Sequence, residues 1–167
     1  MSVMKNLMLY IVEDRKADLA SVRRMLELQI ANSFDLGWPP DDLLLYTNFP
    51  FSSRGVRAIE IEPGVRPRTA RATSFHKTGC ILRAFDRIAR DEVVWYHDVD
   101  AFQLERFHTC PLTRDLAFCL YSTRERLLVQ GGSLFFTSRA QPLFVQVMDQ
   151  LENHRCRKDE FALTDLT

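Results

Sequence analysis

The sequence has no excess of charge of either sign. Its 167 residues include 22 Lys and Arg and 22 Asp and Glu, so the formal net charge is zero and the pI is about 6.9. A domain that binds nucleic acid usually carries a basic excess, because it has to neutralise phosphates. The balanced charge therefore argues against nucleic acid as a partner.

Long hydrophobic runs are also missing. Apolar stretches such as residues 43–46 are far shorter than the roughly 20 residues that cross a bilayer as a helix. The N-terminal residues reach Glu13 and Asp14 without the apolar region of a secretory signal. We expect a cytoplasmic protein without a transmembrane segment.

Cysteines are few and are not closely spaced. Cys80, Cys110, Cys119 and Cys156 form no Cys-x-x-Cys pair, so a zinc site of the usual spacing has no support. A disulfide framework is not expected in a chain without an export signal. We expect all four to behave as small buried hydrophobes.

What the sequence does have is the composition of a folded globular protein, with 46% hydrophobic and 26% charged residues. Its length fits one domain, residues 1–167. Hydrophobic patterning predicts strands over 7–12, 43–47, 56–61, 93–97, 116–121 and 127–137, and helices over 14–29, from about 74 and from 142. Strands and helices alternate through residue 100, which is typical of a mostly parallel central sheet flanked by helices.

The neutral total hides a charge asymmetry. Residues 54–90 contain nine basic and three acidic residues, a net charge of +6, so the remainder of the chain carries −6. Such a division fits a basic surface for an anionic ligand beside an acidic metal site, and it equally fits a solvated face.

Asp98-Val-Asp100 is the sharpest motif, because it directly follows a predicted apolar strand. Ligands of open α/β sheets bind beyond the carboxyl ends of the strands. Two carboxylates separated by one residue can both turn toward a hard divalent cation, which prefers oxygen ligands and keeps positions for phosphate oxygens. The structural alternative is that the aspartates cap a turn. Strand alternation points the neighbouring His97 away from Asp98, so we expect it to pack.

Residues 73–87, 93–100, 129–136 and 159–163 carry a family resemblance. In this order they resemble nucleotide-sugar glycosyltransferases of the A-type, Rossmann-like fold, and the resemblance spans about residues 5 to 165. In that family a helix bearing Lys or Arg precedes a strand that ends in a metal-binding Asp-x-Asp. The resemblance implies a nucleoside diphosphate sugar as donor, with a UDP-sugar favoured, an unknown acceptor, and Mn²⁺ or Mg²⁺ as cofactor.

The resemblance also implies roles around the donor phosphates. Asp98 and Asp100 would hold the cation that bridges the two phosphates, so Asp98 is donor-binding as well. Lys77 would contact the leaving diphosphate, with Arg71 or Arg83 as alternatives. The structural alternative for Lys77 is a solvated helix start.

Further roles are implied at the ends of the donor. Tyr10, Ile11 and Val12 would line the nucleoside pocket, and Gly131 and Gly132 would form a small-residue turn beside the sugar. From the residues alone, the two glycines also fit a plain β-bulge.

Asp159 and Glu160 would be the catalytic carboxylates on the acceptor side, where one takes the proton of the acceptor hydroxyl. Their residue types also suit the first turn of any helix.

The sequence leaves other functions open. The chain stops at Thr167, where family members usually continue on the acceptor side, so it is either a compact member or cut short. A non-catalytic nucleotide-sugar-binding module is therefore the main alternative. A haloacid-dehalogenase-type phosphotransferase, which also uses Asp-x-Asp after a strand, is a more distant one.

Overall fold

A computed structural model describes residues 4–12, 18–62, 64, 70–90, 92–105, 112–124, 127–153 and 155–167. Its strands are β1 Met4–Tyr10, β2 Leu43–Thr47, β3 Ser52–Ser53, β4 Val56–Arg57, β5 Ile59–Glu60, β6 Val93–Asp98, β7 Leu116–Ser122 and β8 Leu127–Thr137. Its helices are α1 Leu19–Asp35, α2 Ala72–Ala84, α3 Gln141–Glu152 and α4 Asp159–Leu166, with 3-10 turns η1 Pro40–Asp42, η2 Phe85–Arg87 and η3 Ser138–Ala140.

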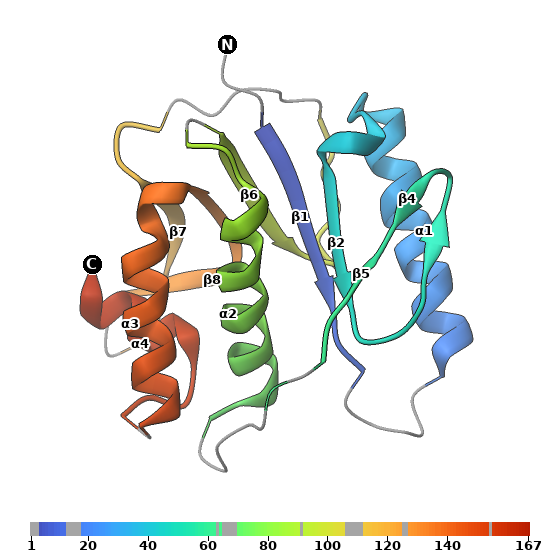
Figure 1. The fold of residues 1–167 in the computed structure, drawn as a ribbon. Helices are drawn as coiled ribbons and strands as arrows, with labels where there is room; N and C mark the ends of the chain where they lie inside the picture. The colour runs from blue at the N-terminus through green and yellow to red at the C-terminus, as the bar shows by residue number, and fades with distance from the viewer. Residues whose placement is uncertain are drawn as a thin grey trace.

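The central sheet has six strands in the order β5-β2-β1-β6-β8-β7 (Figure 1). Strands β5, β2, β1 and β6 are parallel, whereas β8 pairs antiparallel with both β6 and β7. The predicted mostly parallel sheet flanked by helices is therefore confirmed. Because β1 and β6 are adjacent and parallel, their carboxyl ends lie together at the lower edge of the sheet in Figure 1.

Helix α1 covers one face of the sheet. Its apolar stripe, which includes Leu26 and Ile30, packs with Met8 of β1, Leu45 of β2 and Trp95 of β6 in a buried cluster. All of these side chains are less than one-tenth exposed. Strand alternation sends the odd-numbered residues of β6 to this side.

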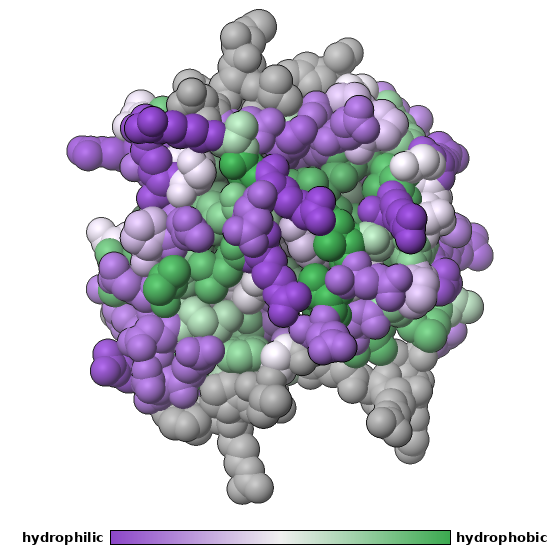
Figure 2. Space-filling model, viewed as in Figure 1, coloured by the Kyte–Doolittle hydropathy of each residue, from purple (hydrophilic) through white to green (hydrophobic). Residues whose placement is uncertain are grey.

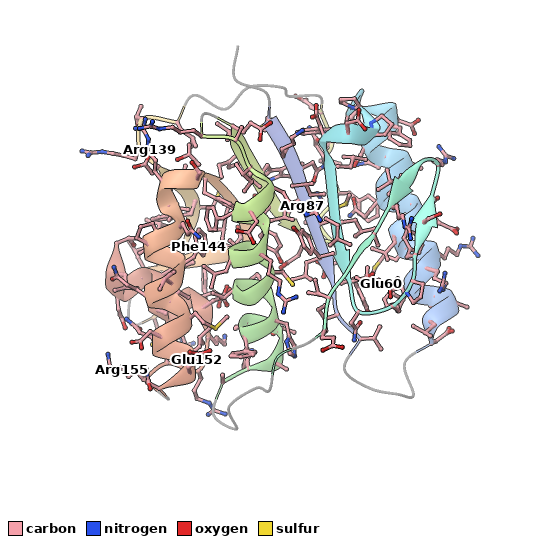
Figure 3. All side chains as sticks on the ribbon, viewed as in Figure 1. Glu60, Arg87, Arg139, Phe144, Glu152 and Arg155 are labelled. Carbon is pink, nitrogen blue, oxygen red and sulfur yellow. The ribbon has the colours of Figure 1, made fainter. Side chains whose placement is uncertain are left out.

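Helices α2, α3 and α4 cover the opposite face. Their buried side chains form a second core with Leu7, Val94, Tyr96 and Leu134 of the sheet. Phe144 points from α3 into this core (Figure 3), and Val147 and Leu151 of the same helix belong to it as well. Hydrophilic residues cover the lower end of α3 in Figure 2.

The first strand and the first helix differ from their predicted bounds. The strand spans residues 4–10 rather than 7–12. The helix has Asp18 as its N-cap, and Asp14, where the predicted helix begins, lies outside the described residues. It runs past Gln29 to Asp35, because its last turns still bury side chains against the sheet. The turn at Gly37, with φ +82°, follows the helix and ends this unit.

The predicted strand over 56–61 is wrong as one element. Residues 52–57 form a small hairpin, β3 with β4, whose tip has positive φ at both Arg54 (+49°) and Gly55 (+87°). That conformation suits the twist of a two-residue hairpin turn. The N–H of Ala58 donates to the carbonyl of Phe51 at 2.9 Å, so the chain joins the main sheet only at Ile59, as β5.

The cysteines are less uniform than predicted. Cys80 is buried, and burial raises the pKa of its thiol to about 12. Cys119 is exposed and Cys156 half-buried, so the expectation that all are buried is wrong for these two, and Cys110 lies outside the described residues. Every helix in the described part of the chain falls short of the length and apolarity needed to cross a bilayer.

Candidate functional site

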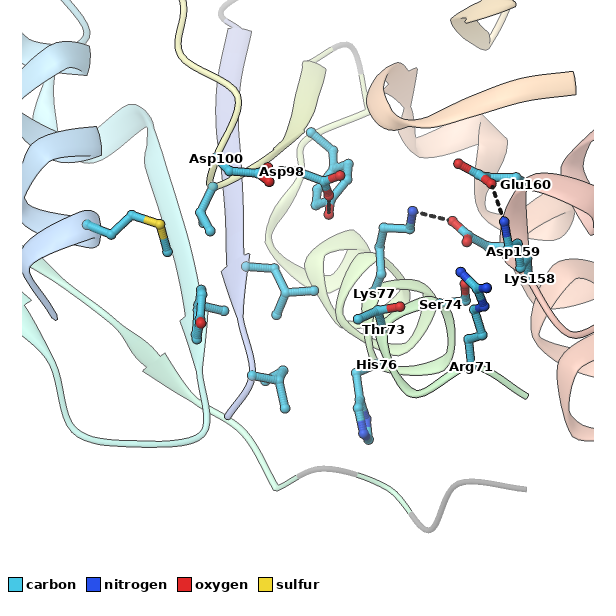
Figure 4. A pocket seen from close by; sticks show the side chains of 16 residues that line it. Arg71, Thr73, Ser74, His76, Lys77, Asp98, Asp100, Lys158, Asp159 and Glu160 are labelled. Carbon is cyan, nitrogen blue, oxygen red and sulfur yellow. Dashed lines mark hydrogen bonds and ion pairs between the residues drawn. The ribbon is translucent and has the colours of Figure 1, made fainter. Parts of the chain in front are cut away.

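A pocket of about 650 Å³ opens at the carboxyl ends of β1 and β6. The end of β1, the turn after β6, the first turns of α2 and the start of α4 all contribute lining side chains (Figure 4). Most predicted site residues meet here, namely Tyr10, Ile11, Lys77, Asp98, Asp100, Asp159 and Glu160. Segments from both ends of the sequence thus contribute to one cavity.

Asp98 and Asp100 face the pocket from a tight turn. The N–H of Ala101 donates to the carbonyl oxygen of Asp98 at 2.9 Å, which closes the turn directly after β6. The Tyr96 hydroxyl donates to Asp98 Oδ1 at 2.5 Å and orients this carboxylate. Burial and the neighbouring Asp98 charge raise the pKa of Tyr96 well above its usual range, so the phenol stays a donor.

Lys77 lies at the centre of the pocket and is held by three groups. Its Nζ is 2.5 Å from Asp159 Oδ2 and donates to the carbonyl oxygen of Gly131 at 3.0 Å. The same ammonium lies 5.8 Å from the centroid of the Tyr96 ring. The side chains of Lys77 and Asp159 are 12% and 4% exposed, so their ion pair is largely shielded from water. The lysine is therefore not a solvated helix start.

Glu160 is the more open of the two predicted catalytic carboxylates. Its side chain is 23% exposed, and its Oε2 lies 3.7 Å from Lys158 Nζ. The Tyr121 hydroxyl donates to the same oxygen at 3.3 Å, which links β7 to the start of α4. Figure 4 shows Asp159 turned toward Lys77 and Glu160 next to Asp159, with its carboxylate paired with Lys158.

Gly131 and Gly132 border the site without being among the residues that line the pocket. A Cβ at Gly131 would lie 2.6 Å from Lys77 Nζ and 2.9 Å from Asp159 Oδ2. A Cβ at Gly132 would lie 2.8 Å from Asp98 Oδ2. Both glycines fall within the register shift between β7 and β8, so the predicted bulge is present. Because the glycines have no side chains, they leave room for the polar groups of Lys77, Asp159 and Asp98.

Two of the three residues predicted for the nucleoside end line the pocket. Tyr10 and Ile11 line the pocket together with Leu9, Met25 and Val99, which gives that side an apolar wall. Val12 is not among the lining residues. Its backbone is bound on both sides by the Asn48 side chain, at 2.8 Å to the N–H and 2.7 Å to the carbonyl oxygen.

Several lining residues were not singled out from the sequence, among them Tyr96 and Lys158 and three at the start of α2, Thr73, Ser74 and His76. For Tyr96 a signal existed, because strand alternation places residues 96 and 98 on the same face. The sequence does not indicate Lys158, because it reaches the pocket only where α4 folds back beside α2. Arg71, an alternative phosphate contact, lines the pocket, whereas Arg83 does not.

His97 packs away from the pocket, as predicted. It is 1% exposed, its ring stacks on Trp95 with centroids 4.2 Å apart, and its Nε2 lies 2.9 Å from Asn6 Oδ1. Its Nδ1 lies 3.0 Å from the carbonyl oxygen of Asp98. Burial lowers the pKa of this imidazole.

The donor set at Asp98 and Asp100 fits a hard divalent cation. Among the described residues, neither carboxylate has a basic partner, and no group of three or more His, Cys, Asp and Glu side chains converges on one point. Proteins usually hold Mg²⁺ with one or two carboxylates and leave the remaining coordination positions to water and substrate phosphates.

Comparison with known proteins identifies a fold. No family model matches the sequence, and no curated protein matches it. The structure is similar to the crystal structure of a glycosyltransferase involved in the glycosylation of the major capsid of PBCV-1, with a TM-score of 0.51 and 12% identity. The match covers 87% of this chain and 66% of that chain, so this chain spans less than two thirds of the glycosyltransferase. The chain thus has a fold similar to that of a glycosyltransferase.

Proposed function

We propose that this protein is a metal-dependent glycosyltransferase that uses a nucleoside diphosphate sugar, with a UDP-sugar favoured. The observation that carries the proposal is the pocket at the ends of β1 and β6. It brings two carboxylates without basic partners in the described part of the chain, Asp98 and Asp100, together with a lysine whose side chain is 12% exposed and a glutamate whose side chain is 23% exposed. The glycosyltransferase-like fold supports the same function.

The charges of the pocket suit a diphosphate that arrives with a cation. The lining includes four carboxylates and three Lys and Arg side chains, and two of these basic groups already pair with Asp159 and Glu160. A bare diphosphate would meet the two remaining carboxylates, Asp98 and Asp100. With Mn²⁺ or Mg²⁺ bound there, the cation would neutralise charge on the leaving diphosphate. The apolar wall formed by Tyr10, Ile11 and Met25 would receive the nucleoside.

Lys77 keeps one N–H group for binding the nucleotide-sugar donor. An ammonium has three N–H groups, and the contacts with Asp159 and the Gly131 carbonyl use two of them. The third would donate to a phosphate or sugar oxygen, where the fixed charge stabilises the negative charge of the transition state. Asp159 is then a positioning residue, because it acts by holding Lys77.

Glu160 is the carboxylate best placed to serve the acceptor. In the transfer, an acceptor hydroxyl oxygen bonds to the anomeric carbon while the bond from that carbon to the diphosphate breaks, and the bonding electrons leave with the diphosphate. The hydroxyl proton goes to Glu160, which is 23% exposed and lies 3.7 Å from Lys158 Nζ, whereas the Asp159 side chain is 4% exposed and lies 2.5 Å from Lys77 Nζ.

A donor panel tests this function. Thermal unfolding is followed with UDP- and GDP-sugars, with and without Mn²⁺, together with release of free sugar. A donor at 100 times its Kd adds about 2.7 kcal/mol to the free energy of unfolding, which is a shift of about 5 to 10 °C in Tm for a chain of this size. The Asp98→Asn/Asp100→Asn variant should lose the metal-dependent part of the shift, whereas Asp86→Asn, on the exposed turn η2, should keep it.

The panel also separates the alternatives. Donor binding without sugar transfer or donor hydrolysis would indicate a nucleotide-sugar-binding module. An acyl phosphate on Asp98 after incubation with phosphoryl donors would indicate the haloacid-dehalogenase chemistry instead. No shift with any donor, with or without metal, would contradict the proposal.

A further inference from the structure

The turn that carries Asp98 and Asp100 is hydrogen-bonded by a residue on the side of the sheet opposite to Lys77. Gln29 lies on α1 and is 1% exposed. Its side-chain amide donates to the carbonyl oxygen of Val99 at 2.6 Å and to that of Ala101 at 3.1 Å. One NH₂ group thus binds the carbonyl oxygens of the residues directly before and directly after Asp100.

A further hydrogen bond from α1 reaches the chain beyond the turn. Asn32, one turn further along α1, donates to the carbonyl oxygen of Gln103 at 3.1 Å. The side chain of Gln103 accepts from Trp38 Nε1 at 2.8 Å and donates to the carbonyl oxygen of Glu105 at 2.6 Å. Asn32 therefore belongs to the same network but contacts a peptide unit three residues after Asp100.

We propose that Gln29 is a positioning residue for the metal site, because it fixes the turn on which both aspartates lie. Two carboxylates bind one cation well only if their spacing is set before the cation arrives, since a mobile turn would have to be ordered on binding. Asp98 is restrained by strand β6 and by the Tyr96 hydroxyl. Asp100 is exposed and lies past the end of the strand, so its position depends on the backbone that Gln29 holds. This inference rests on the proposed metal function.

The chemistry of the amide makes the role specific. The carbonyls of Val99 and Ala101 can only accept, so the side chain that holds both must supply two N–H groups from one point, as a glutamine does. Gln29→Met keeps the length and packing of the side chain and removes both donors. Asn32→Leu is the matched control, because it removes a donor of the same network that is further from the aspartates.

Binding of Mn²⁺ is measured by the loss of the free-ion signal in electron paramagnetic resonance, with Mn²⁺ alone and with UDP. Loss of a group that orients a metal ligand typically weakens metal binding 10- to 100-fold. We expect Gln29→Met to raise the Kd for Mn²⁺ about tenfold and Asn32→Leu to change it less than twofold. Both variants lose hydrogen bonds shielded from water, so both should lower the Tm, and a merely structural role would move the Tm without this difference in Kd.

The outcomes separate this inference from the proposed function. If the wild-type protein binds Mn²⁺ and Gln29→Met binds it equally well, the role of Gln29 is refuted while the metal site stands. If the wild-type protein does not bind Mn²⁺ with or without UDP, both are refuted. Should Gln29→Met fail to fold, NMR of the wild-type protein decides. Saturation with Mg²⁺ should shift the side-chain amide resonance of Gln29 more than that of Asn32, and equal or absent shifts would overturn the inference.

Discussion

Replacing Lys77 with methionine removes the cation from the buried ion pair at the centre of the pocket. In the native protein the Nζ of Lys77 lies 2.5 Å from Asp159 Oδ2, and the two side chains are 12% and 4% exposed. The variant leaves the Asp159 carboxylate buried without its counter-ion, and the Gly131 carbonyl without its donor.

The expected cost follows from this burial. Breaking a buried pair by removing one partner typically costs about 3–5 kcal/mol of stability, compared with roughly 0–1 kcal/mol for the loss of a surface pair. For a chain of this size, a loss of about 3–5 kcal/mol lowers the Tm by about 6 to 20 °C. Lys77→Met/Asp159→Asn removes both charges and should recover most of the loss, because no unpaired charge then remains buried.

The assay is urea unfolding followed by tryptophan fluorescence on the wild type, both single variants and the double variant. Arg155→Met is the matched control. Its guanidinium lies 3.5 Å from Asp149, but the side chains are 69% and 53% exposed, so its loss should cost less than about 1 kcal/mol. A loss below about 1 kcal/mol for Lys77→Met, or additive losses in the double variant, would refute the burial argument.

Three other predictions concern the site and its surroundings. Gly132→Ala places a Cβ 2.8 Å from Asp98 Oδ2, so we expect weaker Mn²⁺ binding by electron paramagnetic resonance, and unchanged affinity would contradict the close approach. Gly79→Ala, inside α2, meets a single methionine methyl at 3.4 Å and should raise the free energy of unfolding by up to about 1 kcal/mol through helix propensity, as urea unfolding would show. Burial raises the pKa of Cys80 to about 12, so under mildly alkaline conditions mass spectrometry should find iodoacetamide on the exposed Cys119 and not on Cys80 in the folded protein.

Much of the fold was predictable because hydrophobic patterning reports burial directly. Strands 43–47 and 127–137 have the predicted bounds, since each contains apolar residues that the sheet buries. The hairpin at 52–57 was missed for a local reason. Its turn is Arg54-Gly55, and an arginine with positive φ gives none of the signal that Asn-Gly or Asp-Gly would have given.

The site was predictable where chemistry follows a strand end, and less so where contacts cross the sheet. Asp98 and Asp100 could be placed because parallel strands deliver their carboxyl ends to one edge. The pairing of Lys77 with Asp159 joins residues 82 positions apart in the sequence, and nothing in the local pattern of either specifies the other. Gln29 could not be predicted for the same reason, because a polar residue on a helix is expected to face solvent unless its buried partners are known.

The spacing of Asp98 and Asp100 has a physical reason in the two faces of the sheet. Alternation along β6 sends Tyr96 and Asp98 toward α2, where the phenol and Lys77 lie, and sends the next residue, Val99, into the core on the α1 side. Val99 is 8% exposed, so its packing anchors the turn from the same side as Gln29. The residue between the aspartates is therefore an anchor, and a polar side chain there would loosen the turn even though it touches neither carboxylate. The two helix layers thus have different roles, since α2 and α4 supply the charged groups whereas α1 holds the backbone that presents the aspartates.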